Sequence, residues 1–116
     1  MYRLFLPVVY LTSTVYSNYI HTHIVPPTIS QANDERRLTT IDRAVRLPCD
    51  AVGRPTPSIV WMKDNQVLDE KDGYNVLDNG MLYIANPQTD HSGRYLCLAR
   101  NSAGTAVLRL TLEVQG

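Results

Sequence analysis

The sequence has no excess of charge of either sign. Its 11 basic residues balance 11 acidic ones, for a formal net charge of +0 at pH 7. A nucleic-acid binder, or a protein that adheres to anionic membrane surfaces, needs a basic excess or a basic stripe. The balance argues against both classes, so we expect a protein partner and no nucleic acid.

The sequence also lacks an apolar run long enough to cross a bilayer. A membrane-spanning helix needs about 20 apolar residues. The apolar run from Leu4 to Leu11 is much shorter and is interrupted by Pro7. We therefore predict no integral membrane segment in this chain.

Signatures of catalysis and of cofactor binding are missing. There is no Gly-rich phosphate loop, no EF-hand loop and no Arg-Gly-Asp tripeptide. Asp90, His91 and Ser92 are only adjacent in sequence, whereas a hydrolytic triad must converge in space, so we interpret His91 as a solvated turn residue. His21 and His23 offer two metal ligands without a third, which fits a polar linker better than a metal site. The chain is predicted to be no enzyme, with no cofactor and no metal.

The Asn-x-Ser/Thr signal for N-linked sugar is absent as well, so no N-glycan is expected. None of the seven asparagines begins this signal: Asn18, Asn33, Asn65, Asn75, Asn79, Asn86 and Asn101.

Only two cysteines are present, Cys49 and Cys97, with neither CxxC spacing nor clustered histidines. This pattern favours a disulfide over a zinc site, because small secreted domains commonly carry such bridges. Two buried free thiols in a cytosolic domain are the alternative.

The N-terminus resembles a secretory signal peptide. Arg3 precedes the apolar run, and a small and polar stretch, residues 12–17, follows it, which predicts cleavage between Ser17 and Asn18. We assign residues 1–17 to this signal, 18–25 to a linker and 26–115 to one domain, since 116 residues suit a single core. The alternative is that residues 1–25 are the tail of a preceding domain or come from a poorly defined gene start.

From Ala44 onward, apolar and polar residues alternate with period two, and turn residues recur between the runs. This pattern predicts an all-β sandwich of about eight strands, counting a first strand between Pro27 and Leu38. Pro48 predicts a bulge or an edge in its strand. Asn79-Gly80 predicts a hairpin with a type I′ turn. The later strands are expected at 44–51, 58–63, 67–68, 74–77, 81–85, 94–101 and 108–114.

The cysteines, a tryptophan and a short motif together resemble the immunoglobulin superfamily. Trp61 follows Cys49 by 12 residues, and Asp90 to Cys97 reads D-x-G-x-Y-x-C. Further motifs are similar to intermediate-set (I-set) domains of hemicentin-like matrix proteins and neural cell adhesion molecules. They are Gly53-x-Pro55-x-Pro57, Leu82-x-Ile84, Ala99-x-Asn101-x-x-Gly104 and Val25-Pro26-Pro27-x-Ile29.

The resemblance implies a two-sheet antiparallel Greek-key sandwich with one inter-sheet disulfide, Cys49 to Cys97, on which Trp61 packs. It also implies that the Tyr95 hydroxyl binds a backbone group of the preceding loop, and that Gly93 permits a tight turn. One position departs from the family. Tyr74 stands where members often carry an arginine that pairs with the residue matching Asp90, so we expect Asp90 to cap its own turn instead.

Strand alternation predicts an apolar outer sheet face with a basic rim. If Trp61, Cys97 and Leu108 point inward, their neighbours point outward. This composition is common in protein-binding surfaces, although scattered apolar residues or a covering domain would explain it too. The loops 53–57 and 102–104 are the second candidate surface. The predicted face comprises Val60, Met62, Leu96, Leu98, Val107, Arg94, Arg100 and Arg109.

These features predict a non-catalytic, secreted or cell-surface recognition module in cell adhesion, axon guidance or matrix assembly, with a homophilic contact as one option. The alternatives are a titin-like intracellular structural domain and an accessory domain of a larger receptor or enzyme. Arg36-Arg37 is interpreted as a charged strand edge that discourages sheet-to-sheet pairing, and a processing site is the alternative.

Intact mass after secretion from a eukaryotic host tests the predicted signal and disulfide. We expect a product that starts at Asn18 and takes up no alkylating reagent unless it is first reduced. Retention in the cell, with Met1 present and two free thiols, would contradict both predictions.

Overall fold

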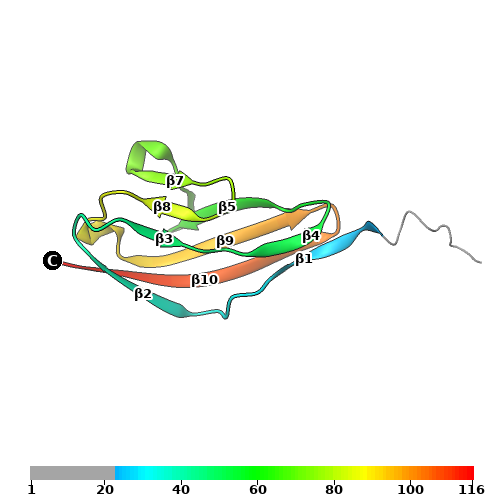
Figure 1. Ribbon diagram of the computed structural model, residues 1–116, viewed down its shortest axis with the longest axis horizontal. Coiled ribbons are helices and arrows are strands. Elements are labelled where there is room, and N and C mark those ends of the chain that lie inside the picture. The colour runs from blue at the N-terminus through cyan, green and yellow to red at the C-terminus, as the bar shows by residue number, and fades with distance from the viewer. Residues whose placement is uncertain (1–22) are drawn as a thin grey trace, which may run out of the picture.

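The computed structural model describes residues 23–116, which form an all-β domain (Figure 1). The predicted signal peptide and His21 lie outside the described residues. Two short 3-10 helices, η2 (Glu70–Asp72) and η3 (Thr89–His91), accompany ten strands. The strands are β1 (Val25–Ile29), β2 (Glu35–Thr40), β3 (Val45–Leu47), β4 (Ala51–Arg54), β5 (Ser58–Lys63), β6 (Gln66–Val67), β7 (Tyr74–Val76), β8 (Leu82–Ile84), β9 (Gly93–Asn101) and β10 (Gly104–Gln115).

The strands form two packed layers, which confirms the predicted sandwich. One layer is a five-stranded sheet in the order β2-β10-β9-β5-β6. The other layer comprises the ladders β3-β8-β7 and β1-β4. These two ladders follow each other directly in the chain, because only residues 48–50 separate β3 from β4. Pro48 lies in this gap, where no ladder needs its missing amide, as predicted. All pairs are antiparallel except β2 with β10, which is parallel.

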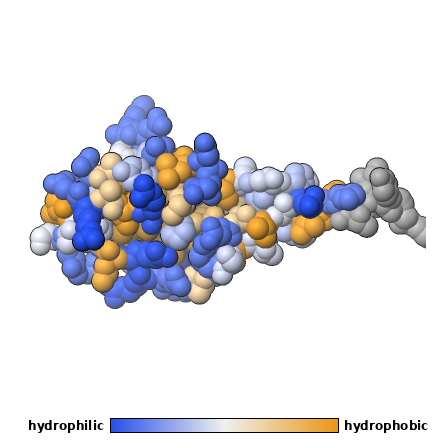
Figure 2. Space-filling model, viewed as in Figure 1, coloured by the Kyte–Doolittle hydropathy of each residue, from blue (hydrophilic) through white to orange (hydrophobic). Residues whose placement is uncertain are grey.

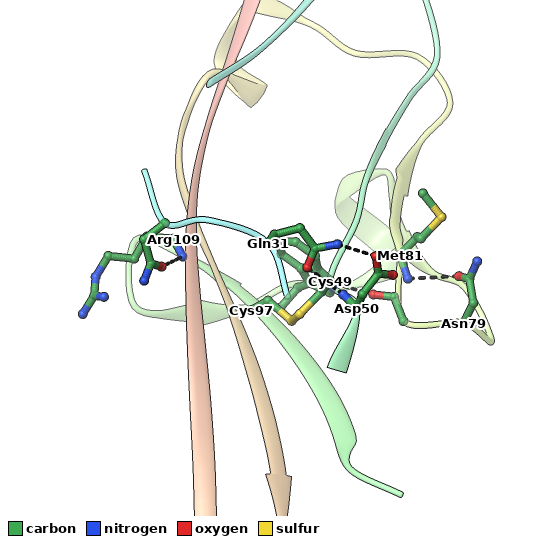
Figure 3. Close-up of a disulfide and its surroundings, with 10 residues drawn as sticks. Gln31, Cys49, Asp50, Asn79, Met81, Cys97 and Arg109 are labelled. Atoms are coloured by element: carbon green, nitrogen blue, oxygen red, sulfur yellow. Dashed lines mark hydrogen bonds between the residues drawn. A yellow bond between two sulfur atoms is a disulfide. The ribbon is translucent and has the colours of Figure 1, made fainter. Parts of the chain in front are cut away.

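The described residues contain ten strands rather than about eight, because the strand predicted between Pro27 and Leu38 is two strands, β1 and β2, and the strand predicted at 44–51 divides into β3 and β4. β1 pairs with β4 in one layer, whereas β2 pairs with β10 in the other. Polar side chains support the crossing between them (Figure 3). Gln31 exchanges two hydrogen bonds with Asp50, and the Asn33 Oδ1 atom accepts one from the Arg109 amide.

The predicted turn type at Asn79-Gly80 is wrong, although the hairpin exists. Gly80 has a φ of 89°, but Asn79 does not have the positive φ that a type I′ turn requires. Instead the Asn79 Oδ1 atom accepts a hydrogen bond of 3.1 Å from the Met81 amide, and the Gly80 amide donates to the Leu77 carbonyl at 2.8 Å. The pair with two positive φ values is Asp64 and Asn65, at 53° and 65°, between β5 and β6.

A disulfide and a tryptophan lie at the centre of the core. Cys49 and Cys97 are bonded, which confirms the predicted bridge between the sheets. Trp61 is opposite Cys97 in the β5-β9 ladder and is 1% exposed. Its indole Nε1 donates a hydrogen bond of 2.8 Å to the Gly80 carbonyl, which ties the five-stranded sheet to the β7-β8 hairpin. The surrounding core contains Leu47, Leu82, Ile84, Leu108, Leu110 and Leu112.

Substitution of Trp61 separates the contribution of this hydrogen bond from that of ring volume. Trp61→Ala should lower the free energy of unfolding by about 3–5 kcal/mol because it leaves a cavity. Trp61→Phe retains much of the volume but leaves the Gly80 carbonyl unpaired, which should cost about 1–3 kcal/mol. Urea unfolding followed by circular dichroism measures both values, with exposed Val52→Ala as the control. A Trp61→Phe variant as stable as wild type would contradict this role of the indole.

Candidate protein-binding face

The structure places all eight residues of the predicted binding face on the outer side of the five-stranded sheet. They alternate along β5, β9 and β10 with the buried residues Trp61, Tyr95, Cys97, Ala99 and Leu108. The alternation follows from strand geometry, because successive side chains point to opposite faces. We call this surface the outer face.

Two rows of apolar side chains cross the outer face. In the first row, Val60 on β5 is opposite Leu98 on β9, which is opposite Val107 on β10. Directly opposed side chains in antiparallel strands lie about 4.5–5.5 Å apart at Cβ, so the three form a continuous strip. Val60 is 37% exposed and Val107 is 36% exposed.

The second row runs from Val67 on β6 to Met62 on β5 and Leu96 on β9, and it ends at Arg109 on β10. Val67 is 64% exposed and was not among the predicted residues. Val67 is opposite Met62 because the two-residue turn between β5 and β6 fixes the register of these strands. Alternation along a single strand does not predict that register. Together the two rows give the outer face an apolar centre.

Basic side chains border this centre on β9 and β10. Arg94, Arg100 and Arg109 are exposed, and none forms an ion pair with another described residue. Arg94 and Arg109 border a pocket of about 290 Å³ whose lining also includes Met62, Leu96, Asp34 and Asp64. A second pocket, of about 300 Å³, is lined by Val60 and Leu98 of the first row, by Met62 and Val67 of the second row, and by Ser58 and Arg100.

Carboxylates border the opposite edge of the same sheet. Asp64 precedes the edge strand β6, and Asp69 follows it after a single intervening residue. Both are exposed. The Asp69 carboxylate caps η2 by accepting a hydrogen bond from the Lys71 amide. The outer face therefore carries charges of both signs around its apolar centre: Asp64 lies 4.0 Å from the Lys63 Nζ atom and borders the same pocket as Arg94 and Arg109.

The second candidate surface, the loops 53–57 and 102–104, is tied together by one side chain. The Asn101 Nδ2 atom donates to the carbonyls of Val25 at 2.8 Å and Pro55 at 3.0 Å, and its Oδ1 atom accepts from the Ala103 amide at 2.8 Å. A Cβ at Gly53 would lie 3.0 Å from the Asn101 Nδ2 atom. The Asn101-x-x-Gly104 motif indicated a turn, but it did not predict the hydrogen bonds from Asn101 to Val25 and Pro55.

At the opposite end of the sandwich, Tyr95 organises the turn before β9. Its hydroxyl donates to the His91 carbonyl at 2.5 Å, as the resemblance implied, and lies 3.0 Å from the Tyr74 hydroxyl. Tyr74 also packs edge-on against the His91 ring, at 5.3 Å between centroids. The residue that departs from the family is therefore part of a buried aromatic cluster.

Asp90 does not cap its own turn, so that expectation is wrong. Gln88 is the N-cap of η3, which leaves Asp90 inside the helix. The Gln88 amide donates to the His91 Nδ1 atom at 2.8 Å, and the Asp90 carboxylate has no hydrogen bond or ion pair with the described residues. His91 thus fills the role expected of Asp90. Its Nε2 atom faces the Asp72 carbonyl at 3.4 Å.

A lysine from β5 supplies the cation at this turn. The Lys63 Nζ atom donates to the Asp90 carbonyl at 2.8 Å and lies 5.8 Å from the centroid of the Tyr95 ring. Gly93 makes room for it, because a Cβ there would lie 2.9 Å from the Lys63 Cε atom and its φ is 148°. Lys63 therefore binds the backbone of this turn and not the Asp90 carboxylate, so it does not reproduce the ion pair of the family pattern.

Arg36 and Arg37 lie on β2, at the edge of the five-stranded sheet. Arg36 pairs with Glu113 and Arg37 with Glu35. Within residues 23–116, no three potential metal ligands cluster together. In the same part of the chain, no helix is long and apolar enough to cross a membrane.

The two-layer sandwich, the inter-sheet disulfide with its opposing tryptophan and the Tyr95 turn define an immunoglobulin-like domain. The family model of the immunoglobulin I-set domain matches residues 27–114. The chain therefore belongs to the immunoglobulin I-set family.

Its relatives are much larger extracellular proteins. The chain is 44% identical to mouse (Mus musculus) hemicentin-1 over 92 residues, which are 78% of this chain and 2% of that protein. It is 41% identical to human (Homo sapiens) Roundabout homolog 3 over 83 residues, which are 71% of this chain and 6% of that protein. The chain thus spans only a small fraction of these relatives.

Solved immunoglobulin domains have the same fold. Immunoglobulin domains 1–4 of Sidekick-1 match with a TM-score of 0.73 and 28% identity, over 98% of this chain and 27% of that one. The titin tandem A164–A165 matches with a TM-score of 0.71 and 26% identity, over 80% of this chain and 49% of that one.

The Tyr95 cluster predicts a loss of stability at alkaline pH. Burial raises the pKa of both Tyr95 and Tyr74 above the ordinary tyrosine value, and the Tyr74 hydrogen bond raises that of Tyr95 further. The unfolded chain therefore releases these protons first as the pH rises. The free energy of unfolding should not depend on these two groups below pH about 10 and should decline above it.

Tyr95→Phe should cost about 1–3 kcal/mol because it leaves the His91 carbonyl and the Tyr74 hydroxyl without their partner. Tyr74→Phe should cost less, since Tyr95 still binds His91. Urea unfolding at several pH values from 7 to 11 measures both effects, and the alkaline decline should be shallower in Tyr95→Phe. An unchanged decline, or a larger cost for Tyr74→Phe, would show that the cluster is misassigned.

Proposed function

We propose that this domain is a non-catalytic recognition module of the extracellular space that binds a protein through its outer face. The observation that carries the proposal is the pair of apolar rows, Val60-Leu98-Val107 and Val67-Met62-Leu96, bordered by exposed arginines. An apolar centre inside a polar rim is the usual anatomy of a protein interface, with arginine enriched and carboxylates depleted at the centre.

The position of the apolar residues supports binding over random surface exposure. On the side shown in Figure 2, hydrophobic residues lie in small groups among hydrophilic ones, which is normal for a soluble domain. On the outer face the ladders instead align six apolar side chains in two adjoining rows. Contiguity of this kind is what marks an interaction surface.

The proposed location rests on the disulfide and on the relatives. Cytosolic thiols are kept reduced, whereas disulfides persist in secreted and cell-surface proteins. The Cys49–Cys97 bridge therefore favours an extracellular module over the titin-like intracellular alternative. Similarity to hemicentin-1 and Roundabout homolog 3 supports a role in matrix assembly, cell adhesion or axon guidance.

The other ordered surfaces suit binding less well. The loops at the Asn101 end are held by hydrogen bonds within the domain, and the pocket beside them is lined by Val25, Val52, Gly53, Arg54 and Thr56 without an apolar row. The Tyr95 end uses its polar groups internally. On the outer face the two apolar rows stay partly exposed, and neither Arg94 nor Arg109 forms an ion pair with another described residue.

Val60→Glu tests the proposal by placing a carboxylate at the centre of the first row. Beads coated with the secreted domain are applied to beads coated with the same domain and to cell-free extracellular matrix deposited by cultured cells. We expect Val60→Glu to reduce bead retention at least about tenfold, because a buried unpaired charge costs more than 1.4 kcal/mol.

The matched control is Val52→Glu, an exposed valine on β4 in the other layer. It introduces the same charge into a strand of the same domain and should leave retention unchanged. Equal loss with both variants, or retention that is insensitive to Val60→Glu, would overturn the assignment of the outer face.

A further inference from the structure

We infer that Asn79 is a site of spontaneous deamidation, that the folded β7-β8 hairpin suppresses this reaction, and that its isoaspartate product breaks the hydrogen bond between Trp61 and Gly80. The inference concerns a covalent modification of the chain and is independent of the proposed binding function. Asn79 is the only one of the seven asparagines that is followed by glycine. Because glycine has no side chain to hinder the approach of its nitrogen to the asparagine amide, Asn79 is the most reactive of the seven.

The reaction takes place between two atoms of this pair. The Gly80 main-chain nitrogen loses its proton and attacks the Asn79 Cγ atom, and Nδ2 takes up a proton and leaves as ammonia. One water molecule then opens the succinimide ring that has formed. Opening at Cγ gives aspartate. Opening at the main-chain carbonyl carbon gives isoaspartate, in which the main chain continues through Cγ and is longer by one methylene group.

In the folded hairpin, both reacting groups are held by other hydrogen bonds. The Gly80 amide donates to the Leu77 carbonyl at 2.8 Å, and the Asn79 Oδ1 atom accepts from the Met81 amide at 3.1 Å (Figure 3). Gly80 is buried, although Asn79 is exposed. A buried, hydrogen-bonded amide loses its proton to solvent only when the local structure opens. The rate of deamidation therefore depends on how often the hairpin opens.

The turn requires the glycine that makes Asn79 reactive. Gly80 has a φ of 89°, a conformation that favours glycine. A Cβ at this position would lie 3.2 Å from the Ile59 Cγ1 atom on β5. A larger residue would therefore strain the turn and displace Ile59, so the fold retains the reactive pair and relies on the closed hairpin for protection.

Isoaspartate at position 79 changes the position of the group that binds Trp61. The Trp61 Nε1 atom donates to the Gly80 carbonyl at 2.8 Å inside the core. The Leu77 amide closes the same turn by donating to the Met81 carbonyl at 2.8 Å. An extra methylene group between these two residues shifts the Gly80 carbonyl relative to β5. The buried indole N–H then loses its acceptor, which destabilises the folded domain.

The first test compares deamidation of the secreted domain in buffer and in guanidinium chloride, at the same temperature and mildly alkaline pH. Peptide mapping by mass spectrometry measures the conversion at Asn79. We expect the native domain to react at least about tenfold more slowly than the unfolded chain. Trp61→Phe leaves the Gly80 carbonyl without its donor and should speed the native reaction at least about fivefold. Exposed Val52→Ala is the control and should react like wild type.

The second test measures the stability of the product. The isoaspartate form is isolated by chromatography and unfolded in urea, and its midpoint should lie below that of wild type. Asn79→Asp is the matched control, because it carries the same new charge on a main chain of normal length. Its carboxylate retains an acceptor for the Met81 amide, so it should unfold close to wild type.

Four results would overturn the inference: no conversion at Asn79 in the unfolded chain, equal rates in the native and unfolded domain, no acceleration in a folded Trp61→Phe variant, or an isoaspartate form as stable as Asn79→Asp. Far-ultraviolet circular dichroism verifies that each variant is folded. None of these results bears on the outer face, because Asn79 lies in the other layer of the sandwich.

Discussion

The disulfide between Cys49 and Cys97 determines which side chains face the solvent, because it fixes the inward phase of β9. With Cys97 inward, Leu96 and Leu98 must point outward. Trp61 is opposite Cys97 in the ladder, so β5 has the same phase and Val60 and Met62 also point outward. The packing of the core therefore determines which residues of β5 and β9 lie on the outer face.

Both ends of the sandwich are held by polar side chains, whereas the apolar rows of the outer face stay partly exposed. At one end, Asn101 bonds to the carbonyls of Val25 and Pro55. At the other end, Tyr95 and Lys63 bind the carbonyls of the turn before β9. These hydrogen bonds satisfy backbone groups that strand ladders cannot reach at the ends of a sheet. They also restrict the loops that serve as binding surfaces in many sandwich domains.

The parts of the fold that the sequence predicts are those in which one strand face is buried. Alternation assigns Val45, Leu47 and Cys49 to the core, and the structure has them buried or half-buried. The division of the first strand into β1 and β2 was missed because its cause lies in distant partners, Asp50 and Arg109, that bind Gln31 and Asn33. Local turn signals do not contain such contacts.

The candidate site shows the same limit. The outward residues of β5, β9 and β10 were predictable, because each strand has a clear inward residue that sets its phase. The place of Val67 depends on the register of β6, and the roles of His91 and Lys63 depend on which strand packs beside the Tyr95 turn. Asp90 was expected to cap because aspartate commonly does so, but η3 begins at Thr89 and places Asp90 past the capping position.

The most direct measurement of the central claim is a titration of the isotope-labelled domain with protein solubilised from extracellular matrix, followed by backbone amide shifts in nuclear magnetic resonance spectra. We predict that concentration-dependent shifts concentrate in β5, β6, β9 and β10 and leave β3, β4 and β8 unchanged. Shifts confined to the loops 53–57 and 102–104, around Asn101, would contradict the assignment of the outer face as the binding surface.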